Sequence, residues 1–187
     1  MADAKPRVFA DANILIRGVT FPRFPYEILR LAAQRKITLI VSPSVLDDVR
    51  HYLAELFPEH LPKLEAFLAL ANVETVAEPT KAEIESQRNL VRDFEDVPVI
   101  LAAIRARVDY FVSTDADFTD ENDSTEKLRG LLVPGKVMKP GVFLSQVIGW
   151  THEQLDAISR RGWKEIREQD PFQSESESQI GDPSTKT

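Results

Sequence analysis

Two aspartates stand directly beyond apolar segments of this 187-residue sequence. Asp11 follows the run Arg7-Val8-Phe9-Ala10, and Asp115 comes shortly after the run Tyr110-Phe111-Val112-Ser113. Ligands of open α/β sheets bind at the carboxyl ends of strands, so two acids that follow neighbouring strands would both reach one cation. Each acid alone also has a simpler explanation, because Asp11 would cap a turn and Asp115 would be a solvated loop acid.

A third acid is expected on the helix that begins after Ser42, where Asp47 and Asp48 are adjacent. The buried stripe of this helix is expected to consist of Val45, Val49, Leu53 and Leu56. At about 100° per residue, Asp48 borders the stripe and Asp47 lies almost opposite. Asp48 is therefore the better ligand candidate. The alternative is a pair of solvated acids that favour the helix dipole.

A fourth acid, Asp96, directly precedes residues 97–104, which are apolar on nearly all sides. Such a segment is typical of a buried helix, and Asp96 stands where its N-cap is expected. Capping alone would account for the residue, with a contribution of about 1 kcal/mol. A capping carboxylate keeps its second oxygen free, however, and would present it to a cation if the helix began at the same sheet edge.

Short polar residues accompany two of these acids. Asn13 and Thr114 suit hydrogen bonding to ligand side chains or positioning of a water molecule. Asp117 follows Asp115 by two residues, and the sequence leaves its role open. The acids farther along are interpreted as a solvated loop and are Asp120, Glu121, Asp123 and Glu126.

The remaining residue types offer no competing chemistry. The absence of cysteine excludes disulfides, thiolate nucleophiles and thiolate metal sites. Zinc-like spacing is missing among the histidines, which are His51, His60 and His152. Neither a phosphate-cradling glycine motif nor a Gly-x-Ser-x-Gly elbow is present. Because carboxylate oxygens suit hard cations, the acids favour Mg²⁺ or Mn²⁺ over zinc.

Short apolar runs alternate with helical patterns along the chain, which is typical of β–α units around a largely parallel sheet. Strands are expected at residues 7–10, 38–41, 73–76, 110–113 and 131–133. Helices are expected at residues 25–35, 43 to about 58, 61–70, 80–92, 97–104, 140–148 and 151–169. Capping boxes at Thr80 and Thr151 indicate where two of these helices begin.

The length suits one core, and the composition changes near the C-terminus. We expect one main domain at residues 1–149, an amphipathic helix at 150–169 and an acidic tail at 170–187. The tail has almost nothing apolar to bury and is expected to be disordered.

The formal net charge of −7 argues against a protein that coats nucleic acid by charge alone. It does not argue against a nuclease, since the tail and the four candidate acids account for this excess. No signal-peptide pattern and no apolar run long enough to cross a bilayer is evident, so a cytoplasmic location without membrane association is expected.

In order and spacing, four segments of the chain resemble the PIN domain family. They are residues 8–15 (VFADANIL), 42–49 with their acid, 93–103, and 109–118 (DYFVSTDADF). The resemblance covers roughly residues 7–145 and implies a three-layer α/β/α sandwich around a parallel sheet. It also implies metal-dependent cleavage of phosphodiester bonds, most often in RNA.

Matched by position, the resemblance assigns the catalytic acids to Asp11, Asp48, Asp96 and Asp115. The metal ligands among the matched acids are Asp11, Asp96 and Asp115, with Asp117 as an additional acid. Asn13 and Thr114 resemble the family's polar companions to the first and last acids. The second acid is commonly Glu in this family, so Asp48 departs from the pattern, and Asp47 competes with it.

The expected activity is that of a Mg²⁺- or Mn²⁺-dependent endoribonuclease acting on single-stranded RNA, with Arg17 and Arg23 as candidate contacts to substrate phosphates. Solvated surface arginines are the alternative for these two residues. A toxin role would add an antitoxin protein as partner, and a homodimer is a family-level expectation.

Two rival functions stay open at this point. A non-catalytic PIN-fold module would bind RNA or protein without cleavage. A haloacid-dehalogenase-like phosphatase would also place Asp11 after a strand, but its acid/base aspartate two residues later is replaced here by Asn13.

Overall fold

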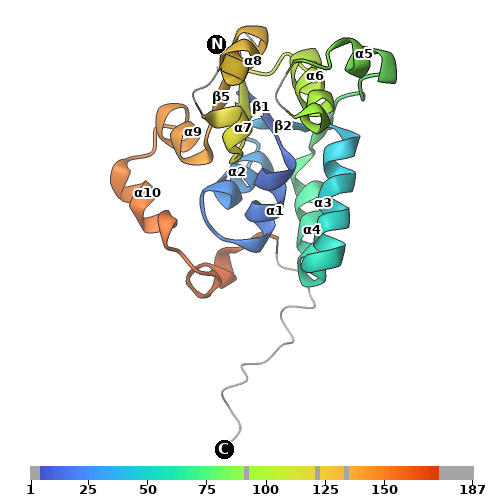
Figure 1. The fold of residues 1–187 in the computed structure, drawn as a ribbon. Helices are drawn as coiled ribbons and strands as arrows, with labels where there is room; N and C mark the ends of the chain where they lie inside the picture. The colour runs from blue at the N-terminus through green and yellow to red at the C-terminus, as the bar shows by residue number, and fades with distance from the viewer. Residues whose placement is uncertain (1–4, 91–92, 121–122, 133–134, 173–187) are drawn as a thin grey trace, which may run out of the picture.

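The computed structural model describes residues 5–90, 93–120, 123–132 and 135–172. Its centre is a five-stranded sheet in the order β3-β2-β1-β4-β5, with every neighbouring pair parallel. The strands are β1 (Arg7–Ala10), β2 (Thr38–Val41), β3 (Glu74–Thr75), β4 (Tyr110–Val112) and β5 (Lys136–Met138). The expected α/β class with a parallel sheet is confirmed (Figure 1).

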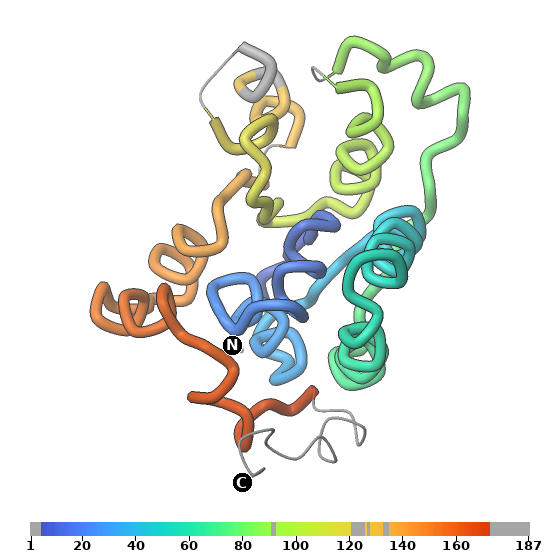
Figure 2. Tube along the Cα trace, turned by 60° about the horizontal axis from the view of Figure 1, so that its bottom comes forward, coloured from blue at the N-terminus to red at the C-terminus, as the bar shows by residue number. Residues whose placement is uncertain are grey.

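Helices cover both faces of the sheet (Figure 2). One layer contains α1 (Ala12–Thr20), α2 (Phe24–Ala33), α3 (Pro43–Leu56) and α4 (Leu61–Ala71). The other layer contains α6 (Val97–Arg105), α7 (Ala116–Thr119) and α8 (Asp123–Leu132), with α5 (Lys81–Ser86) beside it. The last two helices in the chain are α9 (Pro140–Gln146) and α10 (His152–Ser159). The arrangement is the three-layer sandwich that the resemblance implies.

Residues of the two central strands form the middle of the core. The ring of Phe9 on β1 stacks on that of Phe111 on β4 at a centroid distance of 5.6 Å, and Phe118 meets Phe111 edge-on at 5.1 Å. Strands buried on both faces need apolar residues at successive positions, which is why their sequences read as continuous apolar runs.

The predicted helix starts are confirmed where capping residues define them. Ser42 accepts a hydrogen bond from the Val45 N–H at the start of α3. Both predicted capping boxes form, with Thr80 at the start of α5 and Thr151 at the start of α10. The buried stripe predicted for α3 is wrong in one residue, because Leu56 is exposed.

Several predicted boundaries are wrong. The last strand is β5 (Lys136–Met138), whereas residues 131 and 132 belong to α8 and residue 133 lies outside the described residues. The expected solvated loop is partly helical, since α8 begins at Asp123. The helix that starts after Thr80 ends at Ser86, far short of residue 92. The helix α1 had no sequence prediction at all.

The chain after α10 differs most from expectation. The predicted helix over residues 151–169 ends at Ser159 and continues as 3₁₀ turns at Trp163–Glu165 and Arg167–Gln169. We call residues 160–172 the C-terminal strap. It runs back along the lower side of the domain in Figure 2.

The strap is anchored by buried contacts, so the expected tail does not begin at residue 170. Phe172 is fully buried and meets the rings of Tyr26 and Phe67 edge-on. Asp170 forms an ion pair with Lys63 at 2.6 Å and accepts a hydrogen bond from the Tyr26 hydroxyl at 2.8 Å. The remainder of the predicted tail, residues 173–187, lies outside the described residues.

Among the described residues, no helix is long and apolar enough to cross a membrane.

Candidate active site at the carboxyl edge of the sheet

Asp11 occupies the turn between β1 and α1 at the carboxyl edge of the sheet. It is the N-cap of α1, and its carboxylate accepts the N–H groups of Asn13 at 2.5 Å and Ile14 at 3.4 Å. Only 5% of the residue is exposed. Burial raises the pKa of Asp11, the hydrogen bonds to its carboxylate oppose that change, and the charge of Asp115 adds to it.

Ser113 connects Asp11 to the backbone of Asp115. Because β1 pairs directly with β4, Ala10 lies opposite Val112 and the residues that follow both strands are neighbours. The buried Ser113 hydroxyl donates a hydrogen bond to the Asp11 carboxylate and accepts one from the Asp115 N–H at 2.9 Å. One side chain therefore holds together the two strand ends that carry the acids.

Asp115 is the N-cap of α7 and accepts the N–H of Asp117 at 2.9 Å. Both residues are half-buried. The hydroxyl of Thr119 donates to the Asp115 carbonyl at 2.6 Å, which closes the short helix on itself. This local network fixes the backbone of the acidic turn after β4.

The carboxyl of Asp96 is affected by the charges of acids from three chain segments. It precedes α6 as the N-cap residue, but its side chain makes no capping hydrogen bond, so the predicted capping role is wrong. Burial first, and then nearby negative charges, raise its pKa to about 7. The charges that contribute are, in decreasing order, those of Asp93, Asp115, Asp117 and Asp11. The structure thus brings Asp11, Asp96, Asp115 and Asp117 to one edge.

Within the described part of the chain, no three carboxylate or imidazole side chains are arranged closely enough to hold a metal ion as they stand. The acids share an electrostatic environment without forming a preassembled coordination shell. Their donor set consists of carboxylate oxygens alone, which is the set that Mg²⁺ and Mn²⁺ prefer.

No described hydrogen bond, ion pair or charge effect links Asp48 to this group. Both Asp47 and Asp48 lie exposed on α3, and neither is among the charges that raise the pKa of Asp96 or Asp11. Asp47 instead contributes to the raised pKa of Arg50. Val49, the neighbour of Asp48, is fully buried as the stripe predicts, and the assignment of Asp48 to the site stays a prediction.

The two polar companions differ in how the structure uses them. Asn13 contributes its backbone N–H to Asp11. The Thr114 hydroxyl is buried and has no hydrogen-bond partner in the described structure, which leaves a polar atom beside Asp115 available to a ligand.

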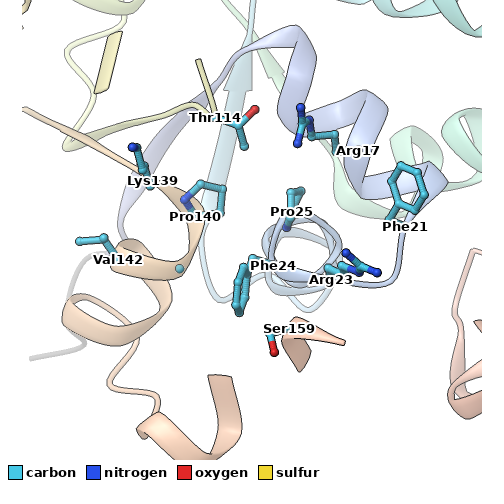
Figure 3. A pocket seen from close by; sticks show the side chains of 11 residues that line it. Arg17, Phe21, Arg23, Phe24, Pro25, Thr114, Lys139, Pro140, Val142 and Ser159 are labelled. Carbon is cyan, nitrogen blue, oxygen red and sulfur yellow. The ribbon is translucent and has the colours of Figure 1, made fainter. Parts of the chain in front are cut away.

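A cleft of about 640 Å³ opens next to Thr114. Its lining includes the two predicted arginines, Arg17 on α1 and Arg23 before α2, and a third cation, Lys139, before α9. In Figure 3, Lys139 lies on one side of Thr114, with Arg17 on the other. We call this feature the cationic cleft.

Sequence reasoning missed Ser113, Asp93 and Lys139. Ser113 ends an apolar run and reads as a strand residue, and its role depends on the pairing of β1 with β4. Asp93 stands in the same acidic segment as Asp96, and that proximity was a usable signal. Nothing local marks Lys139, since its place at the cleft follows from the fold of residues 136–146.

Comparisons with known proteins agree with this architecture. The sequence profile of the PIN domain matches residues 7–117, which include Asp11, Asp48, Asp96, Asp115 and Asp117. A search of curated proteins finds no match.

Among solved structures, the fold resembles a chain of VapBC2 from Rickettsia felis, whose crystal structure contains a DNA fragment from its promoter. The TM-score is 0.50 at 15% identity, and the match covers 71% of this chain and 98% of the other. At this identity the likeness concerns the fold alone. Because the family profile spans more than half of the sequence, the chain belongs to the PIN domain family.

Proposed function

We propose that this protein is a Mg²⁺- or Mn²⁺-dependent endoribonuclease that cleaves phosphodiester bonds of single-stranded RNA. The observation that carries the proposal is the meeting of Asp11 and Asp115 at the paired ends of β1 and β4, where Ser113 links them. The raised pKa of Asp96 agrees with a gathering of carboxylates at this edge. Membership of a family whose domains are generally nucleases supports the same activity.

The residues of the edge fit a divalent cation on two counts. Asp11 and Asp96 both have raised pKa values through burial and like charges, an electrostatic cost that a cation would offset. The buried Thr114 hydroxyl also lacks a partner in the described structure. The proposed ligands are Asp11, Asp96, Asp115 and Asp117.

When bound, the cation would activate a water molecule and stabilise charge on the scissile phosphate. The chain's own groups prepare this chemistry. Ser113 and the first N–H groups of α1 orient the Asp11 carboxylate. The Asp96 carboxyl, whose pKa is about 7, would have to lose its proton to bind a cation.

Asp48 remains a prediction of the family resemblance alone. Its exposed position on α3 makes a direct comparison with its neighbour informative. Replacing Asp48 by Asn should reduce cleavage more than replacing Asp47 by Asn if Asp48 belongs to the site. Equal effects of the two substitutions would remove Asp48 from it.

We further propose that the nuclease acts as the toxin of a toxin–antitoxin pair in the cytoplasm. The fold likeness to a chain of the VapBC2 complex supports this context. The test is copurification of the tagged protein with the product of an adjacent small gene. The absence of such a gene, or failure of its product to bind, would favour an RNA-processing role.

The test of the activity is a cleavage screen on RNA and DNA, each single-stranded and double-stranded, with Mn²⁺, with Mg²⁺ and with EDTA. We expect metal-dependent internal cleavage of single-stranded RNA. Calorimetry with Mn²⁺ on the same preparation distinguishes the non-catalytic alternative. A folded protein that neither binds Mn²⁺ nor cleaves any of these substrates would be a binding module instead.

A further inference from the structure

The cationic cleft carries charges that the proposed chemistry does not use. Arg17, Arg23 and Lys139 reach it from different elements, and all three are exposed. The described structure gives no ion pair for Arg17 or Arg23, and Lys139 has an exposed pair with Asp120 at 3.3 Å. An exposed ion pair contributes little to stability, so Lys139 would readily exchange Asp120 for a stronger anion.

Helix α2 adds to the positive potential of the cleft. It begins there with Arg23 as its N-cap, and no side chain makes a capping hydrogen bond. The N-terminal end of a helix favours negative charge. The cleft therefore suits a polyanion more than an isolated apolar ligand.

Aromatic side chains share this cleft with the cations. Phe21 lines it with 51% of its surface exposed, and Phe24 lines it from the first turn of α2. Gly141 faces the Phe24 ring, since a Cβ at this position would lie 3.8 Å from it. The glycine leaves space beside the ring that a larger side chain would occupy.

The cleft adjoins the candidate active site at Thr114. Thr114 lines the cleft and directly precedes Asp115 in the chain. Figure 3 shows Thr114 above Pro25 and Phe24, with the arginines on one side and Lys139 on the other. A chain of nucleotides that crosses this cleft would pass the acidic edge.

We propose that the cleft binds unpaired nucleotides of the nucleic acid substrate, with bases against Phe21 and Phe24 and phosphates at Arg17, Arg23 and Lys139. This inference rests on the proposed function and adds the strand selectivity of the same site. A volume of about 640 Å³ falls within the usual range of small-ligand pockets, about 300–1,000 Å³.

Selectivity for single strands follows from the aromatic residues. Bases in a duplex are stacked on their neighbours and cannot lie against a phenylalanine ring in a cleft without leaving the stack. Stacking on aromatic side chains combined with a cationic track is the usual way in which proteins bind unpaired strands without sequence readout. An acidic peptide would satisfy the cations but would gain nothing comparable from the aromatic rings.

The experiment measures binding separately from cleavage. The full-length protein is titrated in EDTA with fluorescently labelled RNA as a single strand, as the matching duplex, and as a single strand with abasic sites. We expect the single strand to bind at least about tenfold more tightly than either other form. Equal affinity for all three would overturn the proposal, as would tighter binding of a poly-glutamate peptide of equal charge.

Variants then locate the binding surface. Phe21→Ala should weaken single-strand binding by about tenfold, and Phe21→Trp should retain it. Arg23→Ala should reduce the dependence of RNA affinity on salt concentration by the contribution of about one phosphate contact. Gly141→Leu should block the cleft without changing its charge. The matched controls are Tyr52→Ala, an exposed aromatic on α3, and Lys36→Ala, an exposed cation before β2.

Weakening by the cleft variants and not by the controls supports the proposal, whether or not the protein cleaves RNA. Unchanged affinity of all cleft variants would overturn it, even if metal-dependent cleavage is found. The two outcomes keep the failure of this inference distinct from a failure of the nuclease assignment.

Discussion

The hydroxyl of Ser113 donates a hydrogen bond to the carboxylate of Asp11, a residue 102 positions earlier in the chain. The same hydroxyl accepts the N–H of Asp115, so a buried serine couples the ends of β1 and β4. The relative position of the two acids depends on this small side chain. That dependence can be measured through the pKa of Asp11.

Replacing Ser113 by Ala should raise the pKa of Asp11 further, because the hydrogen bond it removes lowers that pKa. If cleavage needs the ionised carboxylate, the acidic limb of the pH–rate profile should move to higher pH. The loss of stability should be about 1 kcal/mol. Ser145→Ala, at an exposed position of α9, serves as control, and an unmoved acidic limb in Ser113→Ala would show that Ser113 does not tune Asp11.

The stability of the metal-free protein should fall as pH rises towards 7. The pKa of Asp96 is about 7 in the folded state and near 4 in the unfolded chain, so between these values the unfolded state binds fewer protons. The loss is complete above the folded pKa, and solvent screening reduces its size because Asp96 is only half-buried.

Denaturant unfolding of Asp96→Asn from pH 4 to pH 8 checks this prediction. The variant should lack most of the decline in unfolding free energy between pH 4 and pH 7, and it should be more stable than the wild type at pH 8. If the unfolding free energies of the two proteins changed in parallel with pH, Asp96 would ionise normally.

Removal of the buried charge at Lys63 should destabilise the protein strongly. Lys63 and Asp170 are 3% and 2% exposed, and the ammonium group also lies 3.2 Å from the centre of the Trp163 ring. Lys63→Met leaves Asp170 unpaired and should cost about 3–5 kcal/mol in unfolding free energy. The exposed pair of Arg50 with Glu65 is the control, and Arg50→Met should cost less than about 1 kcal/mol.

The double variant Lys63→Met with Asp170→Asn should recover part of the loss, since no buried charge then lacks a partner. Denaturant unfolding of the four proteins measures the recovery. A loss in the single variant no larger than that of Arg50→Met would show that the strap does not depend on this ion pair.

A methyl group at Gly18 should separate α1 from α2. A Cβ there would lie 2.5 Å and 2.8 Å from side-chain atoms of fully buried Leu29, so Gly18→Ala should destabilise by about 1–3 kcal/mol despite its gain in helix propensity. Gly130 on α8 has nothing within 4 Å of its Cβ position. Gly130→Ala should therefore stabilise by about 0.5–1 kcal/mol. Thermal or denaturant unfolding distinguishes the opposite signs.

The sequence predicts the central fold well because the strands β1, β2 and β4 are buried on both faces. Continuous apolar runs then locate them, and the strand-end rule places Asp11 and Asp115 at one edge. The edge strand β5 has only three residues, exposed or half-buried, and carries no such signal. The neighbouring Leu132 belongs to a helix in which it is buried one turn after Leu128.

The remaining features depend on contacts between distant segments. Phe172 stands in a polar stretch, and its burial needs the rings of Tyr26 and Phe67. Likewise, helical spacing ranks Asp48 above Asp47 but cannot show where α3 places either carboxylate relative to the other acids. The joint electrostatics of Asp96 appear only when three chain segments are placed together.

The central claim is that the acids at this edge perform metal-dependent cleavage, and single-turnover cleavage of single-stranded RNA with Mn²⁺ tests it most directly. Asp11→Asn and Asp115→Asn are compared with the wild type and with Asp47→Asn, which removes one exposed carboxylate from α3. We expect each edge variant to lose cleavage by about 100-fold or more while its circular dichroism spectrum is unchanged. Cleavage by both edge variants at the rate of Asp47→Asn would contradict the assignment.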